Sequence, residues 1–102
     1  MDVLVAYDIG TISKEGERRL AKVAAICERY GERVQYSLFE CRVSPANLEI
    51  FKGELLDVIE PSKDTVFIYH FDGSIASVRI TLGRKAIERP GGPWIISSPP
   101  NH

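Results

Sequence analysis

The sequence predicts a single α+β domain in which two helices cover one face of an antiparallel β-sheet. Its 102 residues match the commonest size of one domain, and 44% of them are hydrophobic, which suffices for one core. Two segments repeat apolar residues at the spacing of a helix, whereas others are short apolar or alternating runs typical of strands. These segments follow the order strand, helix, strand, helix, strand, strand, with one late strand near the end.

The first strand and the first helix are separated by a short turn. Val3–Tyr7 is an apolar run too short for a helix, so a buried strand is expected. Ser13 suits the N-cap of a helix over Lys14–Tyr30, because its hydroxyl can accept an amide hydrogen of the first turn. Gly31 is expected to end this helix as a left-handed C-cap. The face that packs inward is expected to consist of Leu20, Val23, Ala24 and Cys27.

A second helix follows a segment of β character. Arg33–Val43 has that character, and its pattern fits either one strand or two. Ser44 and Pro45 predict the start of a helix, since proline suits the first helical position behind a serine cap, and Pro61 ends it. The buried stripe of this helix is expected to consist of Leu48, Phe51, Leu55 and Ile59.

The next predicted element is a hairpin. Thr65–Phe71 is rich in β-branched and aromatic residues, Asp72–Ser74 forms a turn, and Ser77–Leu82 is the expected partner strand. Two helices over one face of a four-stranded antiparallel sheet form a ferredoxin-like sandwich. That fold has two strands between its helices, so Arg33–Val43 would have to bend into two.

After Gly83 the sequence changes character. We assign residues 1–83 to the ferredoxin-like domain and residues 84–102 to a basic linker, a C-terminal strand and a polar tail of the same domain. Trp94–Ile96 is an apolar triplet that is too short to fold by itself and costly to leave in water. It either folds back onto its own sheet or joins the sheet edge of a second copy.

Composition excludes several classes of protein. No run approaches the roughly 20 apolar residues of a membrane span, and Asp2 stands where a signal peptide has basic residues. Cys27 and Cys41 are two scattered thiols, which argues against both a disulfide scaffold and a zinc site. We therefore expect two buried thiols in a cytoplasmic protein without a membrane partner.

The formal net charge of −1 conceals an uneven distribution of charge. Basic residues gather in 14–42 and 79–89, and acidic residues in 49–72. Arg18, Lys22 and Arg29 form a basic stripe on the first helix, with Arg19 beside it and Arg33 just after the helix. Such side chains suit contacts with phosphate groups. The alternative is that they form ion pairs with Glu15, Glu28 and Glu32.

Asp8 is the first candidate for chemistry, because it is an acid at the carboxyl end of a buried strand. Leu4 and Ala6 share its face of that strand, since side chains alternate with a period of two. The alternative to a functional role is an Asx-turn, in which the Asp8 carboxylate accepts amide hydrogens near Gly10.

Aromatic residues at alternating positions form a second candidate site. Phe67, Tyr69 and Phe71 share one face of their strand, as the stacking rings of an RNA-binding sheet do. No Lys/Arg-Gly-Phe signature accompanies them, so we favour a place in the core. His70 has no Cys or Asp at a spacing useful for chemistry and is treated as an ordinary strand residue.

Several of these residues together resemble one known family. They are Tyr7-Asp8-Ile9, Gly16 followed by Arg18-Arg19-Leu20 and Lys22-Val23, and the run YGERVQYSLFEC over Tyr30–Cys41. Gly83, Pro93 and Trp94–Ile96 resemble the tail of the same family. The sequence is similar, over nearly its whole length, to the second of the two universal CRISPR-associated adaptation proteins.

The resemblance implies a ferredoxin-like homodimer in which the late strand is exchanged between the two chains. It implies a metal-dependent endonuclease that acts on RNA or DNA, with Asp8 as a ligand of Mg²⁺. It also implies a role in spacer acquisition, in which the dimer bridges copies of the CRISPR integrase. The alternative function is a non-catalytic dimeric adaptor that bridges the integrase and holds duplex DNA.

One Asp8 carboxylate per chain would hold Mg²⁺ poorly, because the ion takes six oxygen ligands and usually one or two carboxylates among them. A two-fold axis near Asp8 would supply the second carboxylate, so we expect one Mg²⁺ shared between two protomers. The residues expected to position the substrate backbone are Tyr7, Arg19, Arg33, Ser37 and Phe39. Those expected to bind nucleic acid are Arg18, Lys22, Arg84 and Lys85.

Overall fold

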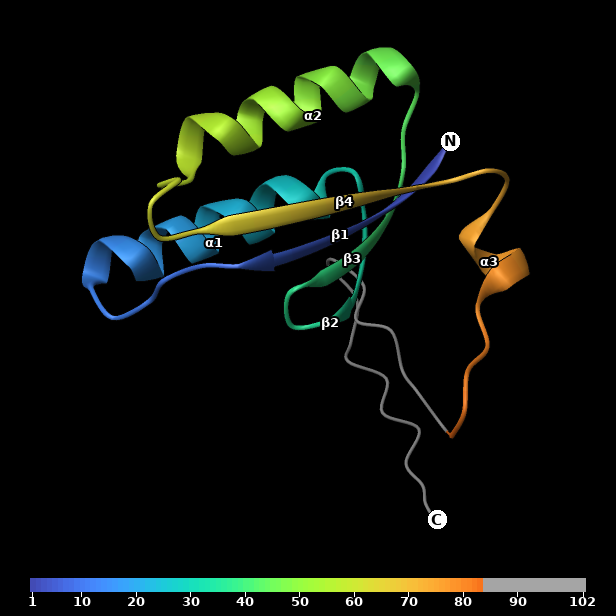
Figure 1. Cartoon of the computed structure of the whole chain (residues 1–102), viewed down its shortest axis with the longest axis horizontal. Helices are drawn as coiled ribbons and strands as arrows, with labels where there is room; N and C mark the ends of the chain where they lie inside the picture. Colours follow the sequence, from blue (N-terminus) through green and yellow to red (C-terminus); the bar gives the residue numbers. More distant parts are fainter. Residues whose placement is uncertain (84–102) are drawn as a thin grey trace.

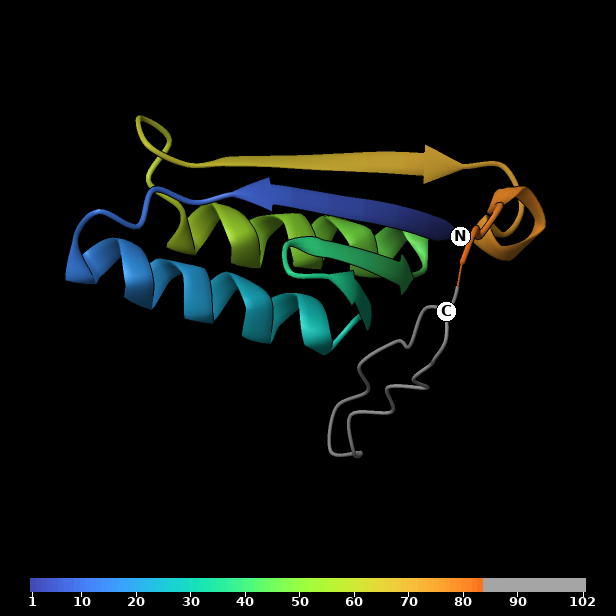
Figure 2. The same ribbon diagram turned by 90° about the horizontal axis from the view of Figure 1, so that it is seen from below.

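The structure is a computed structural model, and it describes residues 1–83. In this part of the chain, a four-stranded sheet carries two long helices on one of its faces (Figures 1 and 2). The elements are β1 (Asp2–Asp8), α1 (Lys14–Glu28), β2 (Gly31–Gln35), β3 (Leu38–Arg42), α2 (Pro45–Val58), β4 (Thr65–Phe71) and α3 (Ile75–Val78).

The sheet has the strand order β2-β3-β1-β4, and all of its neighbouring strands are antiparallel. This arrangement confirms the predicted α+β fold of the ferredoxin-like type. It also decides the question left open by the sequence, because Arg33–Val43 covers two strands. β2 and β3 meet at the turn Tyr36–Ser37, and the register of their pairing shifts between Arg33 and Gln35. Within residues 1–83, no helix is long and apolar enough to cross a membrane.

The two long helices begin where their caps predict. The Ser13 hydroxyl accepts the Gly16 amide at 3.0 Å, and the Ser44 hydroxyl accepts the Asn47 amide at 3.1 Å, with Pro45 in the first turn. These bonds satisfy amide groups that no helical carbonyl can reach.

The hydrophobic core lies between the sheet and the two helices. The predicted stripe of α2 is confirmed for Leu48, Phe51 and Leu55, which are buried, whereas Ile59 is the C-cap after α2 and is only partly buried. In α1 the prediction for Leu20 is wrong, because its side chain is exposed and Ile26 is buried instead. Both cysteines are free and buried as predicted, and burial raises the pKa of each thiol to about 12. The sheet side of the core consists mainly of Val3, Val5, Tyr7, Phe39 and Cys41.

Gly31 does not form the predicted left-handed cap. In residues 1–83 only Gly73 and Gly83 have a positive φ, and the cap of α1 is Arg29 in a right-handed conformation. Gly31 instead begins β2, where a Cβ atom would lie 2.1 Å from the Glu40 carbonyl oxygen. The reason for glycine here is the close approach of two strands, which sequence periodicity does not reveal.

The predicted strand Ser77–Leu82 is also wrong. After Gly73, whose φ is +94°, Ser74 caps the short helix α3. The backbone amide of Ile75 donates to the carboxylate of Asp2 at 2.8 Å, which ties the start of α3 to the start of β1. β4 is therefore an edge strand of the described sheet. The predicted basic linker and late strand, residues 84–102, lie outside the described residues.

Candidate active site

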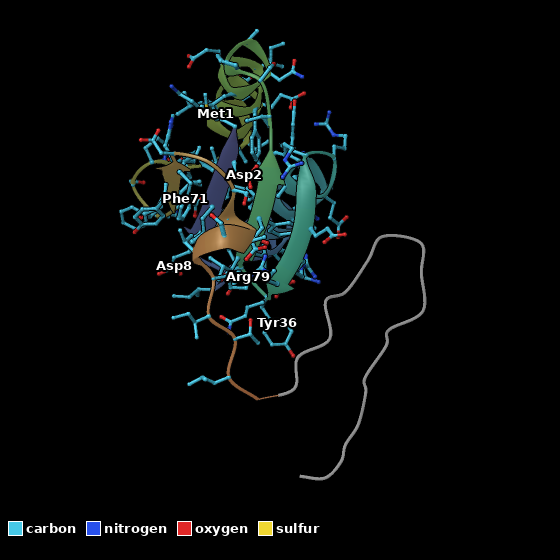
Figure 3. All side chains as sticks on the ribbon, turned by 90° about the vertical axis from the view of Figure 1, so that its right-hand side faces the viewer. Met1, Asp2, Asp8, Tyr36, Phe71 and Arg79 are labelled. Carbon is cyan, nitrogen blue, oxygen red and sulfur yellow. The ribbon has the colours of Figure 1, made fainter. Side chains whose placement is uncertain are left out.

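Asp8 is the last residue of β1 and is exposed. Leu4 and Ala6 share its face and are partly exposed, whereas the alternate residues of β1 are buried against the helices. Asp8 therefore belongs to the face of the sheet that α1 and α2 leave uncovered, which we call the open face (Figure 3). Its partner in the strand register is Thr65. Within residues 1–83, the Asp8 carboxylate has no hydrogen bond or ion pair.

The Asx-turn alternative for Asp8 is wrong. The Gly10 amide donates at 3.0 Å to a carboxylate oxygen of Asp64, which lies 54 residues away in sequence. Asp64 was not among the residues singled out from the sequence. Its local pattern, a single acid before a strand, gives no signal, because its partners Gly10 and Arg19 come from distant segments. Gly10 is thus bound without Asp8, which leaves the Asp8 carboxylate available to a ligand.

Arg19 is the principal partner of Asp64. Its Nε donates to Asp64 Oδ2 at 2.7 Å and its Nη2 donates to Asp64 Oδ1 at 3.1 Å. The Asp64 side chain is fully buried, and that of Arg19 is 15% exposed. The hydrogen bonds from Arg19, with further ones from the Glu60 and Gly10 amides, lower the pKa of Asp64 to about 2. We call these two side chains the Asp64–Arg19 pair.

Tyr7, Phe39, Arg33 and Ser37 lie together at the tip of the β2–β3 hairpin. The Tyr7 and Phe39 rings are both buried, with centroids 6.1 Å apart, and the guanidinium of Arg33 lies over Phe39 at 5.2 Å. The Tyr7 amide donates to the Ser37 carbonyl at 3.1 Å, and the Tyr7 hydroxyl donates to the Tyr36 carbonyl at 3.2 Å. Burial raises the pKa of Tyr7. These bonds hold the hairpin turn beside the end of β1.

The basic stripe of α1 divides into free and paired members. Arg18 and Lys22 are exposed, and within residues 1–83 neither has an ion pair. Arg29 forms an ion pair with Glu54 at 3.2 Å, which is not one of the predicted glutamate partners. The predicted alternative holds for Arg33, which pairs with Glu28 at 3.8 Å. Arg84 and Lys85 lie outside the described residues.

The prediction that Phe67, Tyr69 and Phe71 lie in the core is wrong, since none of them belongs to it, although Phe71 is partly buried. Phe67 is 56% exposed and Tyr69 is 52% exposed, and their rings stack with centroids 6.3 Å apart. The alternate residues Val66 and Ile68 pack against the core instead. The alternation of side chains along β4 was therefore predicted correctly, but the wrong face of the strand was predicted to be buried. Phe67 and Tyr69 belong to the open face, because Phe67 is paired with Ala6 in the register.

One chain offers too few ligands for a divalent cation. Within residues 1–83, no three His, Cys, Asp or Glu side chains are close enough to hold a metal ion. Asp8 is nevertheless a hard oxygen donor, and it is exposed and without a partner in the described part of the chain. Magnesium commonly uses one or two carboxylates together with waters. The residues fit such an ion only if a second Asp8 approaches the first.

Comparison with known proteins decides the family. The family model for CRISPR associated protein Cas2 matches residues 1–76. This chain belongs to the Cas2 family. The resemblance noticed in the sequence is thereby confirmed, and the matched range includes every candidate site residue except Arg84 and Lys85.

Curated Cas2 proteins are similar over most of the chain. A protein of Nitratidesulfovibrio vulgaris named CRISPR-associated endoribonuclease Cas2 is 38% identical over 96 residues, which cover 94% of each chain. A protein of Halalkalibacterium halodurans named CRISPR-associated endonuclease Cas2 is 41% identical over 85 residues, covering 83% of this chain and 88% of its own. The crystal structure of Streptococcus pyogenes Cas2 at pH 6.5 gives a TM-score of 0.74 at 40% identity, over 81% of this chain and all of that one.

Proposed function

We propose that this member of the Cas2 family is a metal-dependent endonuclease of a CRISPR system and that it acts as a homodimer. The observation that carries the proposal is the Asp8 carboxylate, which is exposed at the end of β1 and has no partner in residues 1–83. Relatives over 30% identical bear the names endoribonuclease and endonuclease. Their names support cleavage of a phosphodiester bond.

The open face supports the homodimer. Phe67 and Tyr69 expose more than half of their surface there, and Leu4, Ala6 and Leu38 lie partly exposed on the neighbouring strands. Large exposed apolar patches are typical of interaction surfaces. A second copy related by a two-fold axis would cover the same patch on both chains. Exchange of the late strand Trp94–Ile96 across that axis is the further contact that the family resemblance implies.

An axis close to the end of β1 would bring two Asp8 carboxylates together. Two like charges at short distance repel, and a shared divalent cation relieves that repulsion. Mg²⁺ fits this donor set, since it prefers carboxylate oxygens and retains several waters. When bound, the ion would neutralise charge on the phosphate and lower the pKa of a water.

The reaction is hydrolysis of a phosphodiester. A water oxygen forms a new bond to phosphorus, one P–O bond to a sugar breaks, and the departing sugar oxygen takes a proton. The two Asp8 carboxylates would hold the Mg²⁺ ion at the phosphate that reacts. Arg18 and Lys22 contact neighbouring phosphates of the RNA or DNA, since both are exposed and lack ion pairs in residues 1–83. Arg84 and Lys85 extend that contact.

Tyr7 and Phe39 support the site from the interior, and the half-buried Arg33 lies over the Phe39 ring. Because Tyr7 and Phe39 are buried, they position the strand end and the turn at Ser37 rather than touch the nucleic acid. In the cell, the dimer takes part in spacer acquisition together with the CRISPR integrase. This role follows from the family, and it is compatible with either cleavage or simple holding of duplex DNA.

Substitution of Asp8 tests the proposal. Asp8→Asn should lower the rate of Mg²⁺-dependent cleavage of RNA or DNA by at least about 100-fold, because removal of one preorganised group commonly costs that much. The fold and the dimer should persist, as measured by circular dichroism and sedimentation. Asp57→Asn, which removes an exposed acid of α2, is the matched control and should leave cleavage unchanged.

Two results would contradict the proposal in different ways. Undiminished cleavage by a highly pure Asp8→Asn sample would remove Asp8 from the metal site. Wild-type protein that binds duplex DNA but cleaves neither RNA nor DNA with Mg²⁺ would establish the adaptor function instead.

A further inference from the structure

The loop that follows Asp8 is fixed by bonds to side chains rather than to a neighbouring strand. Gly10 lies two residues after Asp8, and both of its backbone polar groups are bound. Its amide donates to Asp64 Oδ1 at 3.0 Å, and its carbonyl accepts from Arg19 Nη2 at 3.4 Å. The Asp64–Arg19 pair therefore holds both backbone polar groups of one residue next to the candidate metal ligand.

The same pair also holds the strand opposite Asp8. Asp64 directly precedes Thr65, which is the register partner of Asp8 in β4. The second carboxylate oxygen of Asp64 accepts the Glu60 amide at 2.7 Å, so it also closes the turn before β4. One buried carboxylate thus joins the end of β1, the start of β4 and, through Arg19, helix α1.

There is no space for the loop to move toward α1. A Cβ atom on Gly16 would lie 1.9 Å from the Gly10 carbonyl oxygen, and one on Gly10 would lie 3.3 Å from the Lys63 carbonyl oxygen. The loop is therefore packed between the first turn of α1 and the turn before β4. This packing and the hydrogen bonds to the Asp64–Arg19 pair together fix the position of the loop.

We propose that Asp64 and Arg19 act as one positioning unit for Asp8, and that Arg19 is not a contact for the substrate phosphate. The inference rests on the proposed function, since it concerns the geometry of the proposed metal ligand. Arg19 directs two of its nitrogens at Asp64, and its charge is balanced by a buried carboxylate. Arg18 is exposed and has no ion pair in residues 1–83, so it can reach a phosphate.

Arg19→Lys and Asp64→Asn test the unit. Lysine keeps the charge but loses the planar fork that binds both carboxylate oxygens, and asparagine keeps the shape but loses the charge. Both variants should lower kcat while KM stays within about twofold, the pattern of an effect on the chemical step. The Gly10 amide should exchange its hydrogen at least about tenfold faster in both, because its local protection is lost.

Two comparisons separate positioning from other roles. The double variant should be no worse than the worse single variant, because residues acting as a unit are not additive. Arg18→Lys is the matched control, and Gly10 exchange should be unchanged in it. A pair that only stabilised the fold would lower the melting temperature and leave the kcat of folded protein unchanged.

The outcomes distinguish this inference from the proposed function. If Asp8→Asn is inactive but Arg19→Lys has the kcat and the Gly10 exchange rate of the wild type, the proposal that Asp64 and Arg19 position Asp8 is wrong. An effect of Arg19→Lys confined to KM and its salt dependence would make Arg19 a phosphate contact and would also overturn it. If Asp8→Asn itself cleaves normally, the proposed function is what fails.

Discussion

Asp64 is a buried carboxylate whose ionised form the fold stabilises. Its pKa in the folded protein is about 2, against an ordinary value of 3.8, because Arg19 donates to both of its oxygens. As the pH falls below about 4, the unfolded chain binds a proton at this position before the folded chain does. We therefore expect the free energy of unfolding to decrease between pH 4 and pH 2, and this contribution to be fully present above pH 4.

Urea unfolding over that pH range measures the effect. Asp64→Asn should lower stability at pH 7 and show a smaller decrease between pH 4 and pH 2 than the wild type. Asp72→Asn removes an exposed acid outside the pair, and its stability should decrease between pH 4 and pH 2 as much as that of the wild type. Asp2 and Glu54 also have lowered pKa values, but both remain in each variant. Their contributions to the pH dependence of stability are therefore the same in all the proteins compared. Equal slopes for Asp64→Asn and the wild type would contradict the role of Asp64.

At this scale, the sequence located Asp8 but could not locate Asp64. Asp8 follows an apolar run whose period is visible locally, and its place on the same face as Leu4 and Ala6 follows from that period. Asp64 acquires its role from Arg19, 45 residues away. No pattern within a window of ten or fifteen residues records such a contact.

At the scale of elements, two helical glycines have opposite environments. In a helix, alanine is more favourable than glycine by about 1 kcal/mol, so either substitution would stabilise the protein if space were available. A Cβ atom on Gly53 of α2 has nothing within 4 Å. A Cβ atom on Gly16 of α1 would lie 1.9 Å from the Gly10 carbonyl oxygen, which belongs to the backbone and cannot rotate away.

Gly53→Ala should therefore raise the free energy of unfolding by up to about 1 kcal/mol. Gly16→Ala should lower it, because α1 must shift away from the loop after β1. Urea unfolding of the two variants beside the wild type gives both values. A stabilised Gly16→Ala protein would mean that α1 does not pack against that loop as described.

The elements that the sequence predicted correctly are those with local signals. The caps Ser13 and Ser44 and the β-rich run Thr65–Phe71 determine α1, α2 and β4 within a few residues. Helix α3 stands where a strand was predicted, and its Ile75 amide is bound by the Asp2 carboxylate, 73 residues away, a contact that no local pattern reveals. Gly31 was misjudged for the same reason, since its close neighbours belong to β3.

At the scale of the whole molecule, the sequence predicted the layers but not which side of β4 is open. Alternation along a strand gives two faces without saying which one meets the helices. The apolar Phe67 and Tyr69 suggested the core, yet Val66 and Ile68 occupy it. Two sets of apolar residues on one strand support the proposed dimer, in which the helices cover one face and a second copy covers the other.

Phe67→Glu tests whether that partner is a second copy of the chain. Phe67 and Ile50 are each 56% exposed, but Phe67 lies on the open face and Ile50 on α2. A charge at the centre of an apolar interface must be buried without a counter-ion, whereas the same charge on a solvated helix stays in water. Phe67→Glu should therefore weaken self-association at least about tenfold, or about 1.4 kcal/mol, while Ile50→Glu should leave it unchanged. Sedimentation equilibrium gives both dissociation constants.

Because the two substitutions add the same charge at positions of equal exposure, a general effect of charge or solubility would change both proteins alike. An unchanged dimer in Phe67→Glu, or equal weakening in both, would mean that the open face is not where two chains meet, and the two Asp8 carboxylates would then have no axis to share.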